Sequence, residues 1–473
     1  MTTSSSSLVD RLRAAVGADY VRVDDATRAT YGVDAAQRGR PADVVVFPAN
    51  TAEVAAIARA CNETRTPLVP RGAGTGYTGG AVPVRGGVVL TLERLNRILD
   101  IDEQSLLAVV EPNVITGDLQ DAVERVGLFY PPDPASLRQS VIGGNVAECA
   151  GGPRAFKYGV TKQWVLGLEA VLPTGEIIET GGKVVKNVVG YDLTQLLAGS
   201  EGTLAIITKI ILRLIPKPPV QATLRATFPS VRHAVDAVAR LIRARVIPAA
   251  IELIDGESLD AVAKYLNVDS LAPRGTAALL LIEVDGLPEL VQGEADRVAA
   301  ACREAGATEL LRASDAAERQ ELWRVRRELS PSLKVLEPPK PLKFNHDVVV
   351  PKARLPQLFD LLDRIRAEYR LRMPCFGHVG DGNIHVNIMV SPDDADEIRR
   401  AHEAEVVLFK GVIALEGAIS GEHGIGTAKA KYLGLQLSPE TIALMQRVKQ
   451  AFDPHGILNP GKIFPADVAA NPR

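Results

Sequence analysis

The sequence predicts an α+β fold divided into two or more domains. The first observation is length: 473 residues, 46% of them hydrophobic and 23% charged, are enough for more than one hydrophobic core. The second is that short β-rich runs alternate with amphipathic helical runs. The third is the segment PKPP at 216–219, which predicts a boundary between two halves of the chain.

The first half begins, after a polar tail, with a predicted strand at 43–48. Thr51 is expected to be the N-cap of a helix whose apolar residues recur at helical spacing. A second strand at 67–70 leads into a glycine cluster, and two β-rich runs between 87 and 112 precede a helix from 116 to 126. This pattern is typical of an α+β domain.

Two glycine-rich segments are predicted to be loops. Residues 143–159 contain five glycines, two pairs of them adjacent, which suits no interior of a regular element. We therefore expect a loop that is held by something it touches. The second segment, GSEGT at 199–203, precedes the apolar run LAIITKIILRLIP.

The second half alternates strand-like and helical runs, which is typical of an antiparallel sheet with helices packed on one side. The last, glycine-rich segment is expected to return to the first domain. The expected domains are an N-terminal tail and helix at 1–39, a first domain at 40–218, a cap or substrate domain at 219–415 and a C-terminal segment at 416–473.

Charge composition narrows the classes of partner. The net charge of -3 comes from intermingled acids and bases without a basic block. Nucleic acid and anionic membranes are therefore poor candidate partners, and a small-molecule substrate fits better.

The four cysteines are far apart and form no cluster spacing, which argues against an iron–sulfur centre, a zinc ribbon or a disulfide framework. A second redox carrier would therefore sit on another protein. The polar N-terminus lacks the features of a signal peptide, and no run of about 18 apolar residues occurs later. We expect a cytoplasmic protein with no direct membrane span, associated with a membrane only through a partner.

The loop RGAGTGYTGG at 71–80 contains a formal GxGxxG, which alone is a weak signal for a Rossmann dinucleotide site. A Rossmann glycine turn opens a helix, but here a proline, two more glycines and a β-rich run follow. Two alternatives remain. The loop is either a nest of backbone N–H groups for a diphosphate, which needs glycine for close approach and positive φ, or an ordinary glycine-rich turn.

Three segments carry a resemblance to a known family. PRGAGTGYTGG, IGGNVAECAGGPRAFKYGV and VKNVVGYDLTQLLAGSEGTLAIIT resemble, in order, the FAD-binding domain of the vanillyl-alcohol-oxidase superfamily. Within it, the chain resembles the FAD-linked oxidase family, including the glycolate dehydrogenase flavoprotein subunit and the D-lactate and D-2-hydroxyglutarate dehydrogenases. The likeness runs from residue 40 to the closing FDPHGILNPGKIF. It implies a two-subdomain FAD-binding domain of vanillyl-alcohol-oxidase type and a cap domain.

The resemblance also implies which residues line the FAD. The diphosphate would be wrapped by Arg71, Gly72, Ala73, Gly74, Thr75, Gly76, Thr78 and Gly79. The rest of the cofactor would be lined by Gly143, Gly144, Asn145, Gly151, Gly152, Glu201, Gly202, Thr203 and Asn459. Some relatives attach FAD through a histidine near the first loop, but the only histidine before residue 346 is His233, in the second domain. The FAD is therefore expected to be non-covalent.

The motifs GHVGDGNIHVN and SGEHGIG supply a candidate metal site. If residues 380–383 form a hairpin turn, His378 faces His385, with Cβ atoms about 4.5–5.5 Å apart, and both imidazoles can bind one metal. Glu422 is the candidate third ligand, because two histidines and a carboxylate leave positions open for substrate oxygens. The alternative is that these are polar residues in glycine-rich surface turns.

The resemblance implies the same ligand set and adds a base. In relatives, the residues matching His378, His385 and Glu422 bind a divalent metal, expected here to be zinc, manganese or iron, and the residue matching His423 accepts a proton. A metal lowers the pKa of a substrate hydroxyl, and a neutral histidine takes its proton while hydride passes to flavin N5.

A substrate carboxylate beside a flavin needs a cationic partner. Arg326 aligns with the family's anchoring arginine, and Ser330 falls where relatives often have threonine; the alternative for Arg326 is a solvated helix face. Lys343 stands two residues earlier than the lysine of relatives, and Asn345 or His346 takes its place. Either Lys343 still reaches the substrate or carboxylate recognition differs.

Together these features predict an FAD-dependent enzyme that oxidises a small D-2-hydroxy acid, D-lactate or glycolate, to the 2-oxo acid. Electrons are expected to pass to a quinone-linked iron–sulfur subunit, a cytochrome or an electron-transfer flavoprotein. The near alternatives are an oxygen-using oxidase and a D-2-hydroxyglutarate dehydrogenase. A redox-neutral flavin enzyme and a non-catalytic FAD subunit are more remote, because the histidines suit hydroxy-acid oxidation.

Overall fold

The computed structural model describes residues 7–36, 39–268, 271–336 and 341–465. The chain divides into two compact units. Unit 1 comprises Met1–Ala150, Val160–Lys217 and Glu422–Arg473, and unit 2 comprises Gly151–Gly159 and Pro218–Gly421. The outer ends of the expected tail and C-terminal segment, 1–6 and 466–473, lie outside the described residues.

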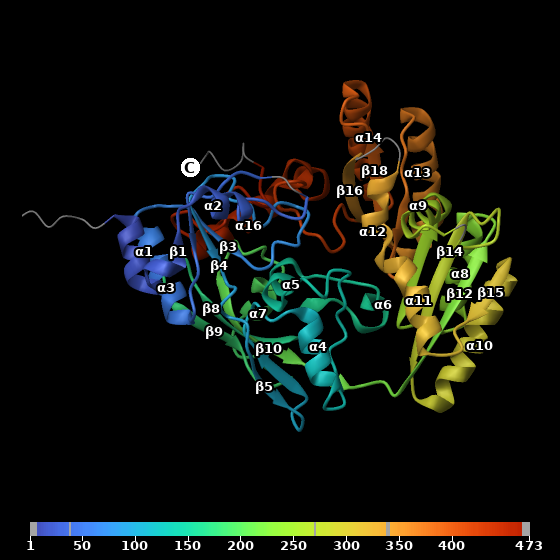
Figure 1. Ribbon diagram of the computed structural model, residues 1–473, viewed down its shortest axis with the longest axis horizontal. Coiled ribbons are helices and arrows are strands. Elements are labelled where there is room, and N and C mark those ends of the chain that lie inside the picture. The colour runs from blue at the N-terminus through green and yellow to red at the C-terminus, as the bar shows by residue number, and fades with distance from the viewer. Residues whose placement is uncertain (1–6, 37–38, 269–270, 337–340, 466–473) are drawn as a thin grey trace, which may run out of the picture. The chain divides into compact units, whose positions relative to one another are not determined.

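Unit 1 combines short helices with short strands (Figure 1). Its helices are α1 (Leu8–Val16), α2 (Asp25–Thr30), α3 (Thr51–Glu63), α4 (Thr116–Glu124), α5 (Ile142–Glu148), α7 (Leu193–Leu197), α15 (Leu433–Gln436) and α16 (Pro439–Phe452). Its strands are β1 (Val21–Arg22), β2 (Val44–Val46), β3 (Leu68–Arg71), β4 (Val88–Thr91), β5 (Ile98–Asp102), β6 (Leu107–Val110), β7 (Leu128–Phe129), β8 (Val165–Val171), β9 (Ile177–Gly181), β10 (Ile206–Arg213) and β11 (Ile215–Pro216).

Two main sheets organise unit 1. The first has the order β1-β2-β4-β3, with β2 and β3 parallel to β4 and β1 antiparallel to β2. Val54 and Ile57 of α3 belong to the same buried cluster as Val88 and Leu90 of β4, as expected for a parallel sheet covered by helices. The second sheet is antiparallel, in the order β5-β6-β10-β8-β9, and β11 pairs separately with β7.

The N-cap of α3 is one residue earlier than predicted. Asn50, not Thr51, has extended backbone angles, and its side chain accepts a hydrogen bond of 2.9 Å from the amide of Glu53. The Glu53 carboxylate in turn accepts from the amide of Ala49 at 2.7 Å. Asparagine caps helices as well as threonine does, so side-chain type could not distinguish Asn50 from Thr51. The backbone angles identify Asn50 as the N-cap.

The prediction of a continuous loop at 143–159 is wrong, because α5 lies within it. Glycine has low helix propensity, but a Cβ atom at Gly143 would lie 2.5 Å from Cβ of Pro112. The close approach of α5 to that proline therefore requires glycine, and tertiary packing outweighs propensity.

Unit 2 contains one large sheet and its covering helices. The helices are α6 (Ala155–Tyr158), α8 (Val231–Arg243), α9 (Gly256–Leu266), α10 (Pro288–Glu304), α11 (Ala316–Arg327), α12 (Leu329–Ser332), α13 (Leu355–Tyr369) and α14 (Ala395–Ala414). The strands are β12 (Val220–Phe228), β13 (Ala250–Asp255), β14 (Ala278–Gly286), β15 (Glu309–Arg312), β16 (Leu342–Val349), β17 (Cys375–Gly377) and β18 (Asn383–Val390). The sheet is antiparallel, in the order β15-β12-β14-β13-β17-β18-β16.

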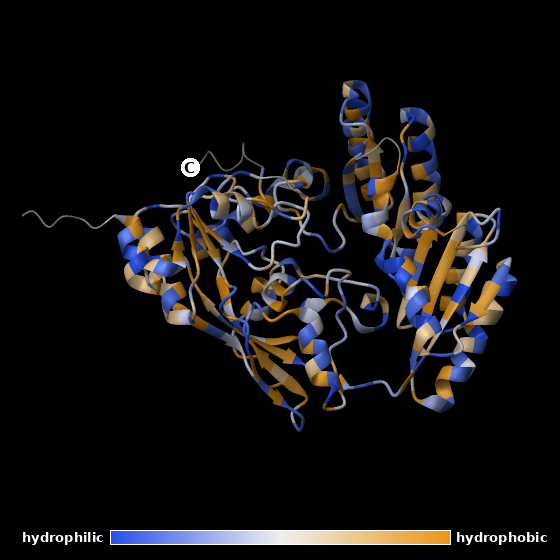
Figure 2. Cartoon of the chain, viewed as in Figure 1, coloured by the Kyte–Doolittle hydropathy of each residue, from blue (hydrophilic) through white to orange (hydrophobic). Residues whose placement is uncertain are grey.

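The two faces of this sheet are covered differently. The expected helical layer is present: α13 packs against α14 and α8, and α8 packs against α10. On the other face, α9, α11 and α12 bury an apolar cluster that includes Ile254, Leu281, Phe376 and Met389 of the sheet. Figure 2 shows the strands as largely hydrophobic and the helices as mixed, so the helices present one apolar side to the sheet. Within the described residues, no helix is both long enough and apolar enough to span a bilayer.

Residues 151–159 are an excursion that joins unit 2. The Lys157 ammonium lies 2.5 Å from Oδ1 of buried Asp285, and the Tyr158 hydroxyl donates to Oδ2 at 2.8 Å. Phe156 lies over Gly380, where a Cβ atom would come within 2.9 Å of its ring. The excursion is therefore fixed to β14 and to the turn that precedes β18.

Replacing Asp285 with alanine is expected to free this excursion. Hydrogen bonds to a charged group each contribute about 1.5–3 kcal/mol, and about 1.4 kcal/mol corresponds to a tenfold change in an equilibrium. Trypsin cleavage after Arg154 and Lys157, followed by mass spectrometry, should accelerate at least about tenfold. Asp360→Ala, which removes an exposed ion pair with Arg232, is the control. Equal cleavage rates in Asp285→Ala and wild type would contradict the assignment.

Candidate active site

The glycine loop of unit 1 follows β3 and offers unpaired backbone donors. Within the described residues, the amide groups of residues 73–76 donate no hydrogen bond. Gly74 has a φ of +69°, and the Arg71 guanidinium lies directly beneath it, bonded to the Val33 carbonyl at 2.7 Å. Open N–H groups above a buried cation suit an anion, so the loop fits a diphosphate.

The candidate base lies next to this loop. The Thr78 hydroxyl donates to the carbonyl of His423 at 3.0 Å, and the amide of Thr427 donates to the Thr78 carbonyl at 2.8 Å. The His423 ring lies 5.9 Å from that of Tyr77, between centroids. The glycine loop and the segment that carries His423 are therefore joined directly.

Glu201 and Asn459 hold these segments together. The Glu201 carboxylate accepts hydrogen bonds of 2.7 Å from the amides of Ile425 and Gly426. The Asn459 side chain donates to the carbonyls of Gly80 and Glu201 at 2.9 and 2.8 Å. Both residues were predicted to line the FAD, and the structure shows their side chains supporting the cradle.

The other predicted cofactor residues have varied positions. Gly72 lies against Val141, just before α5, so Gly143 and Gly144 are beside the glycine loop. The Asn145 side chain donates to Thr116 at 2.7 Å, and the Thr203 hydroxyl donates to the Ser200 carbonyl at 2.7 Å. Gly202 adopts a positive φ of 63°. Gly151 and Gly152 belong to unit 2.

Glu148, at the end of α5, is a buried carboxyl that the sequence analysis missed. Its Oε2 atom has no hydrogen-bond partner among the described residues, and a Cβ atom at Gly424 would lie 2.4 Å from it. Burial and the neighbouring Glu201 raise the pKa of Glu148 well above its usual value. Burial lowers the pKa of nearby Lys462 to about 8. A lone glutamate before a cysteine and two glycines gave no signal in the sequence.

His378 and His385 lie together in unit 2, but the predicted hairpin register is wrong. Phe376, not His378, is opposite His385, because the ladder ends at Gly377 and the turn is longer than four residues. The shift is two residues, which keeps the side chains on the same face. Both histidines are buried, and their ring centroids are 5.3 Å apart.

Glu252 holds His378 and is a second residue that the sequence analysis missed. It lies on β13 with a fully buried side chain, and its Oε1 atom is 2.6 Å from Nδ1 of His378. Its Oε2 atom accepts a hydrogen bond from Nε of Arg326. Although burial alone would raise it, the pKa of Glu252 is held below its usual value by Arg326 and His378. The signal was one acid in the otherwise apolar run AIELI, which makes up the first five residues of β13.

Arg326 is buried and not on a solvated face. It packs over Phe376, with its guanidinium carbon 5.1 Å from the ring centroid. Apart from the bond from Nε to Glu252, none of its N–H groups donates a hydrogen bond to the residues that the structure describes. A buried guanidinium with two available amino groups fits a carboxylate ligand.

The residues of β16 alternate between the two faces. Lys343, Asn345 and Asp347 are opposite Met389, Asn387 and His385 of β18, on the histidine face. The Lys343 ammonium donates to Ser330 at 2.9 Å, and the Asn345 amide donates to Asn387 at 2.7 Å. His346 points the other way, with its ring 5.3 Å from that of Phe409 on α14. His346 therefore lies on the opposite face of the sheet from Lys343 and Asn345.

Asp347 fixes the chain that leads to Glu422. Its carboxylate accepts from the amide of Gly421 at 2.9 Å and from the side chain of Asn383 at 2.6 Å. Gly421 ends unit 2, and Glu422 follows it by one peptide bond. Oε1 of Glu422 is 3.6 Å from Nε2 of His423. The two buried imidazoles on this face are donors that fit a divalent metal.

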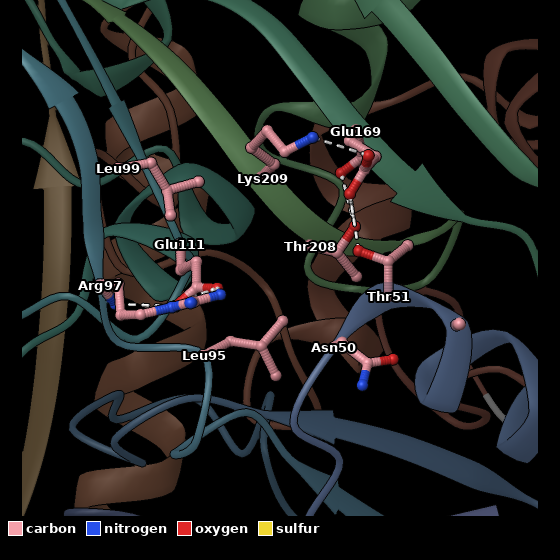
Figure 3. Close-up of a pocket in the computed structure, with 10 residues that line it drawn as sticks. Asn50, Thr51, Leu95, Arg97, Leu99, Glu111, Glu169, Thr208 and Lys209 are labelled. Carbon is pink, nitrogen blue, oxygen red and sulfur yellow. Dashed lines mark hydrogen bonds and ion pairs between the residues drawn. The ribbon is translucent and has the colours of Figure 1, made fainter.

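A hollow of about 420 Å³ elsewhere in unit 1 contains none of these residues (Figure 3). Figure 3 shows its charges paired within it: Glu169 with Lys209 at 2.8 Å and Arg97 with Glu111 at 2.7 Å. Its lining residues are Asn50, Thr51, Ala52, Leu95, Arg97, Leu99, Glu111, Glu169, Thr208 and Lys209. Because these charges are already neutralised, the hollow offers no free group for chemistry.

Comparisons with known proteins match two families to successive parts of the chain. Residues 42–181 match the family described as FAD binding domain, and residues 217–463 match FAD linked oxidases, C-terminal domain. Glycolate oxidase subunit GlcD of Bacillus subtilis is 43% identical, covering 94% of this chain and 93% of the relative. GlcD of Escherichia coli is 38% identical, with 91% and 85% covered. D-lactate dehydrogenase of Anaerostipes hadrus is 36% identical, with 90% of each covered.

Solved structures share the fold. p-Cresol methylhydroxylase with bound substrate matches with a TM-score of 0.77 at 20% identity, covering 97% of each chain. Alkyldihydroxyacetonephosphate synthase matches with a TM-score of 0.75 at 20% identity, covering 97% of this chain and 86% of that one. These structures confirm the α+β fold that the motifs predicted. The family match over residues 217–463 and the relative at 43% identity show that the chain belongs to the FAD-linked oxidase family.

Proposed function

We propose that this protein uses bound FAD to oxidise a small D-2-hydroxy acid, glycolate or D-lactate, to the 2-oxo acid. The observation that carries the proposal lies on one face of the unit 2 sheet. There, two buried imidazoles occur with Arg326, whose terminal amino groups bond to none of the described residues. This pairing suits a ligand that carries both a hydroxyl and a carboxylate.

His378, His385 and Glu422 would hold a divalent metal, and the glycine loop and α5 would hold the FAD. When bound, the metal lowers the pKa of the substrate hydroxyl and the FAD accepts the hydride. His423 would take the hydroxyl proton on its ring, and its place beside Tyr77 and Thr78 puts it next to the cofactor loop.

Arg326 and Lys343 would orient the substrate through its carboxylate. Arg326 provides two parallel donors, and Lys343 provides a single ammonium beside Ser330. Phe376, which packs between Arg326 and His385, limits the room on this face. A compact hydroxy acid satisfies both anchors without a further cation.

The names of the relatives support the substrate class and a partner. Relatives that cover most of this chain are named glycolate oxidase subunit GlcD and D-lactate dehydrogenase. We propose that this chain likewise works beside a subunit or protein that accepts its electrons. The four cysteines lie in no cluster motif, so the chain supplies no iron–sulfur ligand spacing of its own.

The proposal is tested by adding hydroxy acids to the anaerobic flavin-loaded protein and following the visible absorbance. Rapid bleaching by glycolate or D-lactate, faster than by L-lactate and D-2-hydroxyglutarate and slowed by a chelator, is the expected result. Absence of bleaching by all four acids would contradict the proposed activity. Bleaching that a chelator leaves unchanged would contradict the metal alone.

His423→Ala should slow flavin reduction by a factor of about 10² to 10⁴, because the proton loses its acceptor. Stopped-flow absorbance at saturating substrate measures the rate. His233→Ala, which removes a histidine on α8 far along the chain from the motifs, is the control and should retain the wild-type rate. A wild-type rate in His423→Ala would rule out this base.

Substrate affinity should weaken as the pH rises through about 8. Burial lowers the pKa of Lys343 to about 8, so its positive charge is lost above that pH. In Lys343→Arg the side chain stays charged above this pH. The increase in KM that comes from loss of the lysine charge should therefore disappear. The measurement is KM from about pH 7 to about pH 9.5 in both proteins. Parallel KM profiles would show that Lys343 does not anchor the substrate.

A further inference from the structure

We infer that Glu252 is a positioning residue that sets both the metal-binding ring of His378 and the carboxylate-binding guanidinium of Arg326. The inference rests on the proposed function and extends it to a residue outside the predicted set. Glu252 lies on the central strand β13, two residues before Ile254, and faces the same side of the sheet as Phe376 and His385.

Each carboxylate oxygen of Glu252 serves a different residue. Oε1 pairs with His378 at 2.6 Å and Oε2 pairs with Arg326. The side chain is fully buried, and it makes no other hydrogen bond within the described part of the chain. One carboxylate is therefore shared between the two functional groups.

This contact selects the form of His378 that binds a metal. An ionised carboxylate only accepts, so Nδ1 of His378 must carry the proton and donate it. Nε2 is then the ring nitrogen that carries the lone pair, and the carboxylate makes the ring a stronger ligand. Replacing Glu252 therefore removes the acceptor that selects this tautomer and holds Nδ1.

The contact between Glu252 and Arg326 occupies Nε and leaves the terminal amino groups of Arg326 for the substrate carboxylate. The bond to Glu252 uses Nε, and stacking on Phe376 fixes the plane of the guanidinium. The two terminal amino groups then point away from Glu252 as a fork for the substrate carboxylate. Metal binding and substrate anchoring thus depend on the same side chain.

A glutamine cannot replace this glutamate. A glutamine side chain has one acceptor and one NH₂ donor, so it cannot accept hydrogen bonds from both His378 and Arg326. If its oxygen serves Arg326, its NH₂ faces Nδ1 and favours the tautomer protonated on Nε2, which cannot bind metal. An aspartate keeps the charge, but its shorter chain cannot reach both partners.

Glu283 provides a matched control on the neighbouring strand β14. It is also a buried carboxylate, and it accepts from Trp323 at 2.8 Å and from the Thr223 hydroxyl at 2.9 Å. Neither partner is a proposed site residue. Glu283→Gln therefore reports the effect of removing a buried charge from this face without touching His378 or Arg326.

The experiment measures zinc affinity by chelator competition, and KM and kcat for the best hydroxy acid, in the flavin-loaded full chain. Glu252→Gln and Glu252→Asp should bind zinc about 10- to 100-fold more weakly and show a raised KM. Added zinc should restore kcat more than KM. Glu283→Gln should match the wild type in both quantities.

Wild-type zinc affinity and KM in folded Glu252→Gln would overturn the inference. Zinc binding by His378→Ala that equals the wild type would instead overturn the proposed metal site. Because Glu252→Gln could fail to fold, nitrogen NMR of ¹⁵N-histidine-labelled wild type provides a second test, with His378→Asn assigning the signal. A proton on Nδ1 supports the inference, and a proton on Nε2 contradicts it.

Discussion

Buried charge on one face of the seven-stranded sheet is the constraint on which the arrangement of unit 2 depends. An ionised group removed from water is strongly destabilising unless it is paired. Three acids meet this requirement in different ways. Asp285 pairs with Lys157 of the excursion, Asp347 accepts from the backbone before Glu422, and Glu252 pairs with His378 and Arg326. These pairings bring residues distant in sequence to one surface, and there they define the candidate site.

In unit 1 the constraint is different, because the candidate cofactor site consists mainly of loops that must be held in position. Loops hold a position only when their polar groups are bonded to something rigid. Thr78, Glu201 and Asn459 supply these bonds between the glycine loop, the segment after His423 and the C-terminal segment. The amide donors of residues 73–76 are left open within the described residues. The side chains hold the loops in place, and the open backbone donors are the groups proposed to bind the cofactor.

Motifs and periodicity predicted the family, the α+β fold and most strands, and they placed His378 and His385 on one face. They did not predict the hairpin register, since a turn with two glycines and an Asp-Gly pair allows more than one length. They missed α5, because only the contact of Gly143 with Pro112 explains a glycine there. Glu252 could have been suspected from its place in an apolar strand. Its two partners could not, because they lie 74 and 126 residues away.

The proposed reaction requires that residues of the hairpin and of the following motif bind one metal ion. Anomalous diffraction from crystals of the zinc-loaded protein, collected on both sides of the zinc edge, tests it most directly. The proposed ligand set predicts one peak about 2.0–2.2 Å from a ring nitrogen of His378, a ring nitrogen of His385 and a carboxylate oxygen of Glu422. The absence of a peak beside these residues, or a peak bound by other side chains, would contradict it.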